Sequence, residues 1–176
     1  MSDAVPFDLQ PTLVGPLVTL RPLTPADRDA LFAVAKDPLI WEQHPDKTRC
    51  RPDGFSAFFQ ESLDSGGALL AMDSGIGRVI GSSRYHGYDA STDEVEIGWT
   101  FLARSHWGGR YNADMKRLML DHAFRYVGRV VFLIDPANHR SQRAVEKIGA
   151  TRVGMRTGAS GRTSCVFQIS APARPA

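Results

Sequence analysis

The chain has 176 residues, 43% of them hydrophobic and 9% aromatic, a composition that supports one globular domain with a buried core. Its 21 basic and 19 acidic residues give a formal net charge of +2, which excludes the strongly basic balance of a nucleic-acid-binding protein. The two cysteines, Cys50 and Cys165, are far apart and lack metal-ligand spacing, so we expect neither a metal site nor a disulfide scaffold.

The first predicted elements are a strand and two helices. Alternating apolar and polar residues predict the strand at Leu17–Leu23. Thr24 has the features of a helix N-cap and Pro25 those of the first helical position, so a helix is expected from there to about Lys36. A second helix is expected from about Pro52 to the next Gly-Gly pair, because phenylalanines recur along it on one side.

The rest of the chain alternates strands with two longer helices, each closed by a glycine. The strands are predicted at Ala68–Met72, Val79–Tyr88, Glu94–Leu102, Val130–Ile134, Ala150–Thr157 and Thr163–Ser170, and the helices at Tyr111–Val127 and Asn138–Ile148. The order β-αα-βββ-α-β-α-ββ contains one strand–helix–strand unit, and a helical crossover returns the chain in the same direction. The expected fold class is therefore α/β (α+β): one mixed, mostly antiparallel sheet with helices on both faces. It forms a single domain over residues 13–170, and we expect residues 1–12 and 171–176 to be flexible.

The predicted strand Glu94–Leu102 contains residues that do not suit a covered central strand. Alternation divides it into two faces, Val95, Ile97, Trp99 and Phe101 on one and Glu96, Gly98 and Thr100 on the other. Central strands flanked by helices are usually apolar throughout, so a carboxylate and a glycine are out of pattern. The glycine would let a ligand approach the backbone closely.

The segment after this strand, Trp107–Asn112, enters the long helix through a glycine pair. Unpaired N–H groups and the helix dipole favour an anion at a helix N-terminus, and glycines let a phosphate come close to them. Arg110 would add a charged donor. The alternative interpretation is a plain tight turn. Further on, Asn138 followed by Ser141 is typical of a helix N-cap.

Together these pieces resemble the GNAT superfamily, and within it the RimJ/RimL-like type of ribosomal-protein acetyltransferase. The resemblance covers nearly all of residues 13–170. The matching pieces are Leu20-Arg21-Pro22-Leu23 with Asp27, Ile80-Gly81, Glu96-Ile97-Gly98-Trp99, Trp107-Gly108, Asn138-x-x-Ser141 and Glu146-Lys147-x-Gly149-Ala150. The resemblance implies an N-acetyltransferase that moves the acetyl group of acetyl-CoA to a primary amine, on a protein N-terminus or a small molecule, without a metal.

The resemblance also implies a set of cofactor contacts. The strand end would pair its backbone with the pantetheine arm, through Trp99, Thr100, Phe101 and Leu102. The loop would hold the pyrophosphate, through Trp107, Gly108, Gly109, Arg110, Tyr111 and Asn112. Asn138 and Ser141 would lie near the thioester. The sequence departs from the family in three places. Arg110 stands where a second glycine is usual, and Asn112 where an alanine is usual. The tyrosine general acid that many members carry does not occur between Asn138 and Gly149.

Glu96 is the candidate catalytic base, because burial on a covered sheet face should raise its pKa toward neutrality. The alternative is that Glu96 only pairs with Arg84 or His86 on the neighbouring strand. Ser141 is the candidate proton donor to the departing thiolate, and a backbone N–H near Thr100 the candidate oxyanion donor.

Trp41, His44 and Arg84 are the candidates for the acceptor pocket. Trp41 and His44 lie between the first two helices, a region that usually shapes this pocket in the family. The alternative for Trp41 is a surface tryptophan over the edge of the core. Of the other histidines, His122 is expected to be a satisfied core residue, whereas His106 and His139 should face solvent or the cofactor cleft.

A rival interpretation is a protein that keeps the fold and binds acyl-CoA without catalysis, as a sensor or partner-binding domain. The opening segment has no basic stretch followed by a long apolar run, and no stretch approaches the roughly 20 apolar residues of a membrane span. We therefore expect a cytoplasmic protein with no membrane or nucleic-acid partner. The oligomeric state stays open, with a homodimer as the state common in the family.

Overall fold

The computed structural model describes residues 6–173, and in this part of the chain eight strands form one sheet. The strands are β1 (Leu13–Val14), β2 (Val18–Pro22), β3 (Ala68–Asp73), β4 (Val79–Asp89), β5 (Glu94–Leu102), β6 (Arg129–Ile134), β7 (Thr151–Thr157) and β8 (Thr163–Ser170). Their order in the sheet is β1-β2-β3-β4-β5-β6-β8-β7, and the pairs are antiparallel except for β5 with β6. The predicted fold class is confirmed.

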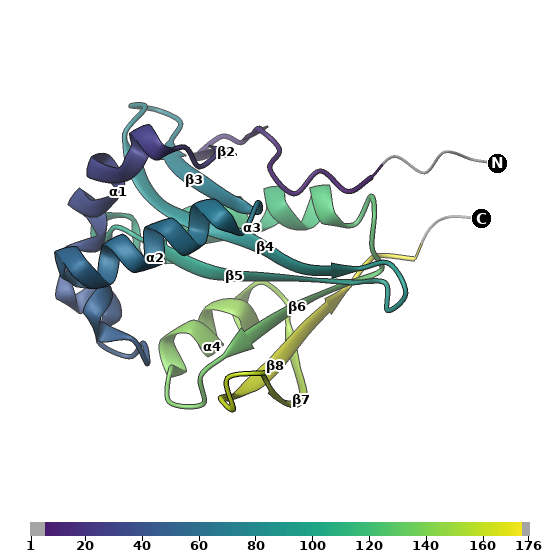
Figure 1. The fold of residues 1–176 in the computed structure, drawn as a ribbon. Coiled ribbons are helices and arrows are strands. Elements are labelled where there is room, and N and C mark those ends of the chain that lie inside the picture. The colour runs from purple at the N-terminus through teal and green to yellow at the C-terminus, as the bar shows by residue number, and fades with distance from the viewer. Residues whose placement is uncertain (1–5, 174–176) are drawn as a thin grey trace.

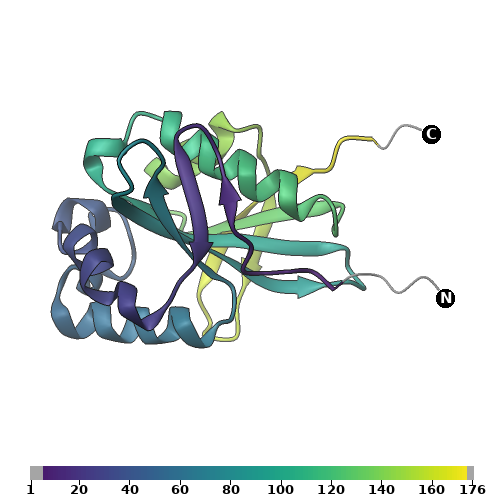
Figure 2. The same cartoon turned by 90° about the horizontal axis from the view of Figure 1, so that it is seen from above.

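Helices cover both faces of the sheet (Figures 1 and 2). The α-helices of the described residues are α1 (Arg28–Ala35), α2 (Pro52–Asp64), α3 (Arg110–Ala123) and α4 (His139–Lys147). Short 3-10 turns occur at Pro25–Asp27, Pro38–Trp41, Lys47–Cys50 and Arg104–His106. One apolar cluster includes residues of α3 and α4, and a second lies under α1 and α2 on the other face. The hydrophobic effect thus holds two layers of helix against one sheet.

Local hydrogen bonds determine where the first predicted helix begins. The Asp27 carboxylate accepts hydrogen bonds from the Thr24 backbone N–H and hydroxyl, at 2.8 and 2.9 Å, as a capping group does. Arg21 on β2 donates two more, at 2.7 and 2.9 Å. This bidentate pair ties the entry of α1 to the sheet.

A bulge at Trp99 changes the faces of β5. Across this point β5 has one residue more than β4, and Trp99 adopts a φ of +51°. Val95 and Ile97 therefore belong to the cluster against α3, whereas Phe101 belongs to the cluster under α1 and α2. The prediction that Val95, Ile97, Trp99 and Phe101 share one face is wrong beyond the bulge, and Thr100 turns toward α3 instead.

The parallel strands β5 and β6 separate along their length. They pair only where Glu94–Glu96 lies beside Arg129–Val131, and from there they run apart (Figure 1). The stretch of β5 beyond Glu96 is paired on its other side with β4. One edge of β5 is thus left facing a gap in the middle of the sheet.

The predicted flexible ends include residues 1–5 and 174–176, which lie outside the described residues. From residue 6 the chain is anchored by Phe7, which is 8% exposed and stacks on Tyr126 with 4.6 Å between ring centres. His122 is buried beside it and contacts the Asp8 carbonyl through Nε2 at 2.7 Å. The prediction that His122 is a satisfied core histidine is confirmed, and the Phe7 anchor is a feature that composition did not reveal.

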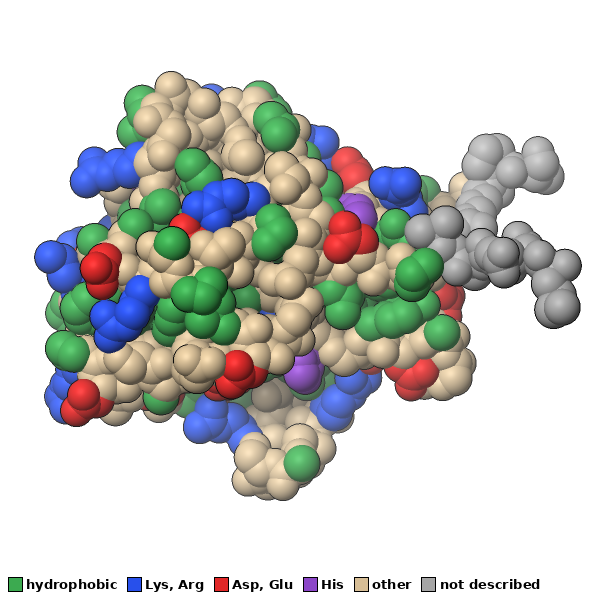
Figure 3. Space-filling model, turned by 45° about the horizontal axis from the view of Figure 1, so that its top comes forward, with side chains coloured by type: hydrophobic (Ala, Val, Ile, Leu, Met, Phe, Trp, Pro, Cys, Tyr) green, Lys and Arg blue, Asp and Glu red, His purple; other side chains and the backbone are tan. Residues whose placement is uncertain are grey.

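On the face shown in Figure 3, basic and acidic side chains are interspersed. Among residues 6–173, the helices are too short and too polar to cross a membrane.

Candidate active site

A cavity of about 770 Å³ opens where β5 and β6 separate. Its walls come from β5, β6, the N-terminal half of α3, α4, and the turn that carries Trp41. We call it the central cavity. The predicted site residues that line it are Trp41, His44, Glu96, Trp99, Thr100, Phe101, Leu102, Trp107, Gly108, Gly109, Asn112, Asn138 and Ser141. Three others, Arg84, Arg110 and Tyr111, are not among its lining residues.

One end of the central cavity is built around the N-terminus of α3. Gly108 and Gly109 have φ values of +108° and +101°, which side chains other than glycine rarely adopt. The first amide of the helix to reach a carbonyl is that of Ala113, so the N–H groups before it have no intrahelical partner. The Trp107 indole N–H donates to the Leu102 carbonyl at 2.9 Å and fixes this loop to the end of β5. The geometry is that of an anion site.

Arg110 and Tyr111 are not among the residues that line the cavity, although their backbone N–H groups belong to this anion site. Arg110 is exposed, and the Tyr111 hydroxyl donates to Asp73 at 3.1 Å. Three positively charged residues of α4 line the central cavity: Arg140, Arg143 and Lys147. Arg140 lies over the Trp107 ring, 4.5 Å from its centre.

Glu96 lies on the wall of the central cavity and has an unusual pKa. Burial raises the pKa of its carboxyl to about 7, although the charges of Arg156 and Arg84 act against that rise. Within residues 6–173 its carboxylate takes part in no ion pair with either residue that the alternative interpretation offered. Arg84 pairs with Glu61 at 3.0 Å, and His86 packs against the Trp99 ring. Burial, and not an ion pair with Arg84 or His86, therefore dominates the environment of this carboxyl.

Arg84 does not line the acceptor side of the cavity as predicted. It is 2% exposed and points toward α2, where it bonds Glu61 at 3.0 Å and the Ser62 hydroxyl at 2.7 Å. Its guanidinium also covers the Trp99 ring. The predicted substrate contact is not observed, because Arg84 lies on β4 opposite Gly98 and its side chain is taken up by α2.

Trp41 and His44 do line the central cavity. Trp41 is 3% exposed and donates its indole N–H to the Ala35 carbonyl at 2.7 Å, so the surface-tryptophan alternative is wrong. Burial and the nearby charge of Arg49 lower the pKa of His44 to about 4, and its ring is neutral at pH 7. Of the remaining histidines, His106 lines the cavity and His139 is exposed.

Asn138 caps α4 as predicted, its side chain accepting from the Ser141 N–H at 3.2 Å. Both residues line the central cavity from the α4 side. The capping role therefore holds the start of α4 at the cavity wall, where the Ser141 side chain is also exposed to a ligand.

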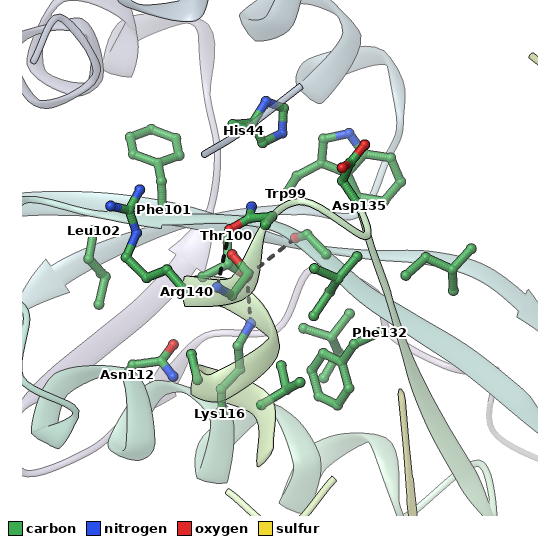
Figure 4. Close-up of a pocket in the computed structure, with 18 of the residues that line it drawn as sticks. His44, Trp99, Thr100, Phe101, Leu102, Asn112, Lys116, Phe132, Asp135 and Arg140 are labelled. Atoms are coloured by element: carbon green, nitrogen blue, oxygen red, sulfur yellow. Dashed lines mark hydrogen bonds between the residues drawn. The ribbon is translucent and has the colours of Figure 1, made fainter. Parts of the chain in front are cut away.

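Sequence reasoning missed Lys116, which rises from α3 into the cavity wall (Figure 4). It is 3% exposed, and its ammonium donates to the hydroxyls of Thr100 on β5 and Ser83 on β4. Burial lowers its pKa to about 7. A signal was present, since Lys116 lies between Met115 and Met119 on the apolar side of the helix. Lysines at such positions usually extend to solvent, so the pattern alone does not reveal burial.

Comparison with known proteins shows which family has this architecture. A model of the acetyltransferase (GNAT) domain matches residues 18–151. The Bacillus subtilis protein YkkB is 47% identical over 57 residues, a match that spans 31% of this chain and only 33% of the relative.

Solved structures share the fold at low sequence identity. A GCN5-related N-acetyltransferase from Brucella melitensis superposes with a TM-score of 0.81 at 18% identity, over 94% of this chain and 80% of that one. RimJ from Mycobacterium smegmatis, solved with CoA-disulfide, gives 0.71 at 20% identity, over 93% and 89%. An acetyltransferase from Agrobacterium tumefaciens gives 0.72 at 24% identity, over 92% and 95%. The family match covers most of the chain and agrees with the fold: the protein belongs to the GNAT acetyltransferase family.

Proposed function

We propose that this protein is an N-acetyltransferase that moves the acetyl group of acetyl-CoA directly to a primary amine. The observation that carries the proposal is Glu96, a carboxyl on the wall of the central cavity whose pKa burial raises to about 7. A base with that pKa is suited to removing a proton from an amine near neutrality. The anion site at α3 lies at the other end of the same cavity and would hold the phosphates of the acetyl donor.

The residues present fit acetyl-CoA. Beyond Glu96 the edge of β5 is not paired with β6, so it can offer backbone groups to an extended ligand with amides of its own, as the pantetheine arm has. We assign this edge, Trp99–Leu102, to the arm, and the loop Trp107–Asn112 to the pyrophosphate. Asn138 and Ser141 would lie near the thioester. Arg140, Arg143 and Lys147 supply positive charge around the phosphates.

The proposed chemistry assigns one task to each group. Glu96 takes a proton from the amine, directly or through water, so that the nitrogen can attack the acetyl carbonyl. A backbone N–H near Thr100 stabilises the negative charge that develops on the carbonyl oxygen. Ser141 is the hydroxyl near the thioester and the first candidate for the proton that the thiolate needs.

The acceptor is a primary amine, either a protein N-terminus or a small molecule, and Trp41 and His44 border its place beside Glu96. Arg110 and Tyr111 keep a smaller proposed role, at the outer side of the phosphate loop. We also propose that the protein is a single domain, that it is cytoplasmic and that it forms a homodimer.

Two measurements test it. Acetyl-CoA and CoA should each raise the melting temperature of the protein, since a ligand that binds only the folded state stabilises it. Release of free CoA thiol should then depend on an added amine, in a panel of N-terminal peptides, amino acids and polyamines. Stabilisation without amine-dependent turnover would support the non-catalytic sensor instead, and the absence of both would overturn acetyl-CoA binding.

A further inference from the structure

Lys116 is buried, and its ammonium group has more N–H donors than hydrogen-bond partners. Within residues 6–173, its recorded hydrogen-bond partners are the hydroxyls of Thr100 and Ser83. A lysine ammonium has three protons, so these two bonds leave one for a ligand in the central cavity that Lys116 lines. Burying a charge without an opposite charge is costly, and an apolar side chain of similar length would avoid that cost. A buried lysine at position 116 is therefore better explained by a function than by stability.

The histidines of the cavity wall are not well placed to give this proton, and one of them, His86, packs against the Trp99 ring. The His44 ring is neutral near pH 7, because burial lowers its pKa to about 4. His106 is held by Asp73, whose carboxylate lies 3.0 Å from its Nε2. Guanidinium groups do not release protons in proteins, and Glu96 is already assigned as the base. Lys116, with a pKa near 7, is partly protonated at neutral pH, the condition that suits a general acid.

Ser141 is the weaker candidate for the same task. A serine hydroxyl is a much weaker acid than a thiol, so it gives its proton to a thiolate only if another group replaces that proton. Within the described chain the Ser141 hydroxyl has no hydrogen bond to such a group, and its backbone N–H bonds Asn138. The ammonium can donate without help.

We propose that Lys116 is the proton donor of the acetyl transfer, giving a proton from Nζ to the sulfur of CoA as the carbon–sulfur bond breaks. The inference rests on the proposed N-acetyltransferase function. The amine nitrogen bonds to the acetyl carbonyl carbon, and the electron pair of the broken bond stays on sulfur. The protonated amine first gives one proton to Glu96, which passes it to water. The nitrogen gives its second proton to Glu96 once the carbon–nitrogen bond has formed, and the proton gained by sulfur comes from Lys116. Exchange with water restores both groups.

The surroundings keep Lys116 in this state. Titratable or charged groups on the elements around it are Asp114 on α3, Tyr85 on β4, Glu96 on β5, Asp135 after β6, and Arg143 and Lys147 on α4. Asp114 is directed to the N–H groups of Leu17 and Val18, and the Tyr85 hydroxyl donates to the Met119 carbonyl. Neither forms an ion pair with Lys116.

The test is the pH dependence of kcat/KM for acetyl-CoA at a saturating amine concentration. The wild-type profile should be bell-shaped, falling at high pH as Lys116 loses its proton. Lys116→Met should lower kcat at pH 7 by about a hundredfold and remove the fall at high pH. A Lys116→Met profile that keeps the wild-type fall at high pH would overturn the assignment.

Two further readouts separate proton donation from a structural role. Thr100→Val removes an acceptor of the ammonium, so the fall at high pH should move to lower pH without disappearing; an unmoved limb counts against the proposal. The dissociation constant for CoA should be near the wild-type value in Lys116→Met. A weaker affinity with unchanged kcat, or acetylation of Lys116 in the intact-protein mass, would overturn the proposal. If the wild type turns over no amine, the proposed function itself fails.

Discussion

The Arg84 guanidinium lies 4.3 Å from the centre of the Trp99 ring. Arg84 is also bonded to Glu61 and Ser62, so one side chain joins α2 to the bulge of β5. The bulge turns Thr100 toward α3 and Lys116, which places its hydroxyl on the wall of the central cavity. The layer under α2 thus helps to set the geometry on the opposite side of the strand.

Arg84→Met should therefore destabilise the protein. The variant loses hydrogen bonds from a buried cation and the contact with Trp99, at a cost of about 2 kcal/mol in the free energy of unfolding. The cost stays moderate because the Glu61 side chain is 58% exposed and water can solvate it. Urea denaturation measures the change. Arg28→Met is the matched control, since its partner Asp29 is 96% exposed, and equal losses in both variants would contradict the argument.

Glu96→Gln should change the acid side of the pH–rate profile. The base must be ionised to accept a proton, so wild-type kcat/KM should rise as pH increases through about 7. The glutamine variant cannot ionise, and its kcat/KM at pH 7 should fall by about a hundredfold with a flat acid limb. Thiol release across pH 5–9 is the measurement.

Glu146→Gln is the control for that experiment, because Glu146 is an exposed carboxylate on α4 that does not line the central cavity. Its profile should match that of the wild type. An acid limb that persists unchanged in Glu96→Gln would remove Glu96 from the mechanism.

The pattern of the sequence predicts the fold well where local rules dominate. The expected strand Glu94–Leu102 agrees with the structure at both ends, and the helix expected at Tyr111–Val127 is observed at Arg110–Ala123. Apolar periodicity, caps and glycines carry this information locally. The β-bulge escapes such rules, because one inserted residue depends on the register with β4 and reverses every face beyond Trp99.

The candidate site is predictable to a similar degree. The loop and Glu96 stood out because their residue types are unusual where they occur, and both line the cavity. Arg110 is exposed and does not line the cavity, and its contact with phosphate stays a prediction. Lys116 depends on the packing of α3 against β4 and β5, which a single sequence does not reveal.

Gly109→Ala should weaken CoA binding more than Arg110→Ala does. Gly109 has a φ of +101°, and an added Cβ would meet no atom within 4 Å, so the cost is backbone strain and not a clash. Strain of about 1–2 kcal/mol, relieved by moving the loop, corresponds to roughly a tenfold loss of affinity. Removing an exposed arginine costs less than about 1 kcal/mol. Titration calorimetry with CoA compares the two, and a larger loss in Arg110→Ala would show that the side chain holds the phosphates.

Lys116→Met should make the folded protein more stable at neutral pH, by an amount that shrinks as pH rises. Burial lowers the pKa of Lys116 from 10.5 to about 7, so between these values the unfolded chain binds a proton that the folded chain does not. Wild-type stability should therefore rise with pH across that window, by at most about 1.4 kcal/mol per pH unit. The methionine variant lacks this proton, and its advantage should be largest at or below pH 7 and vanish above about pH 10.5. Chemical denaturation of both proteins from pH 6 to pH 10 measures the difference; a constant gap would mean that Lys116 keeps an ordinary pKa in the folded state.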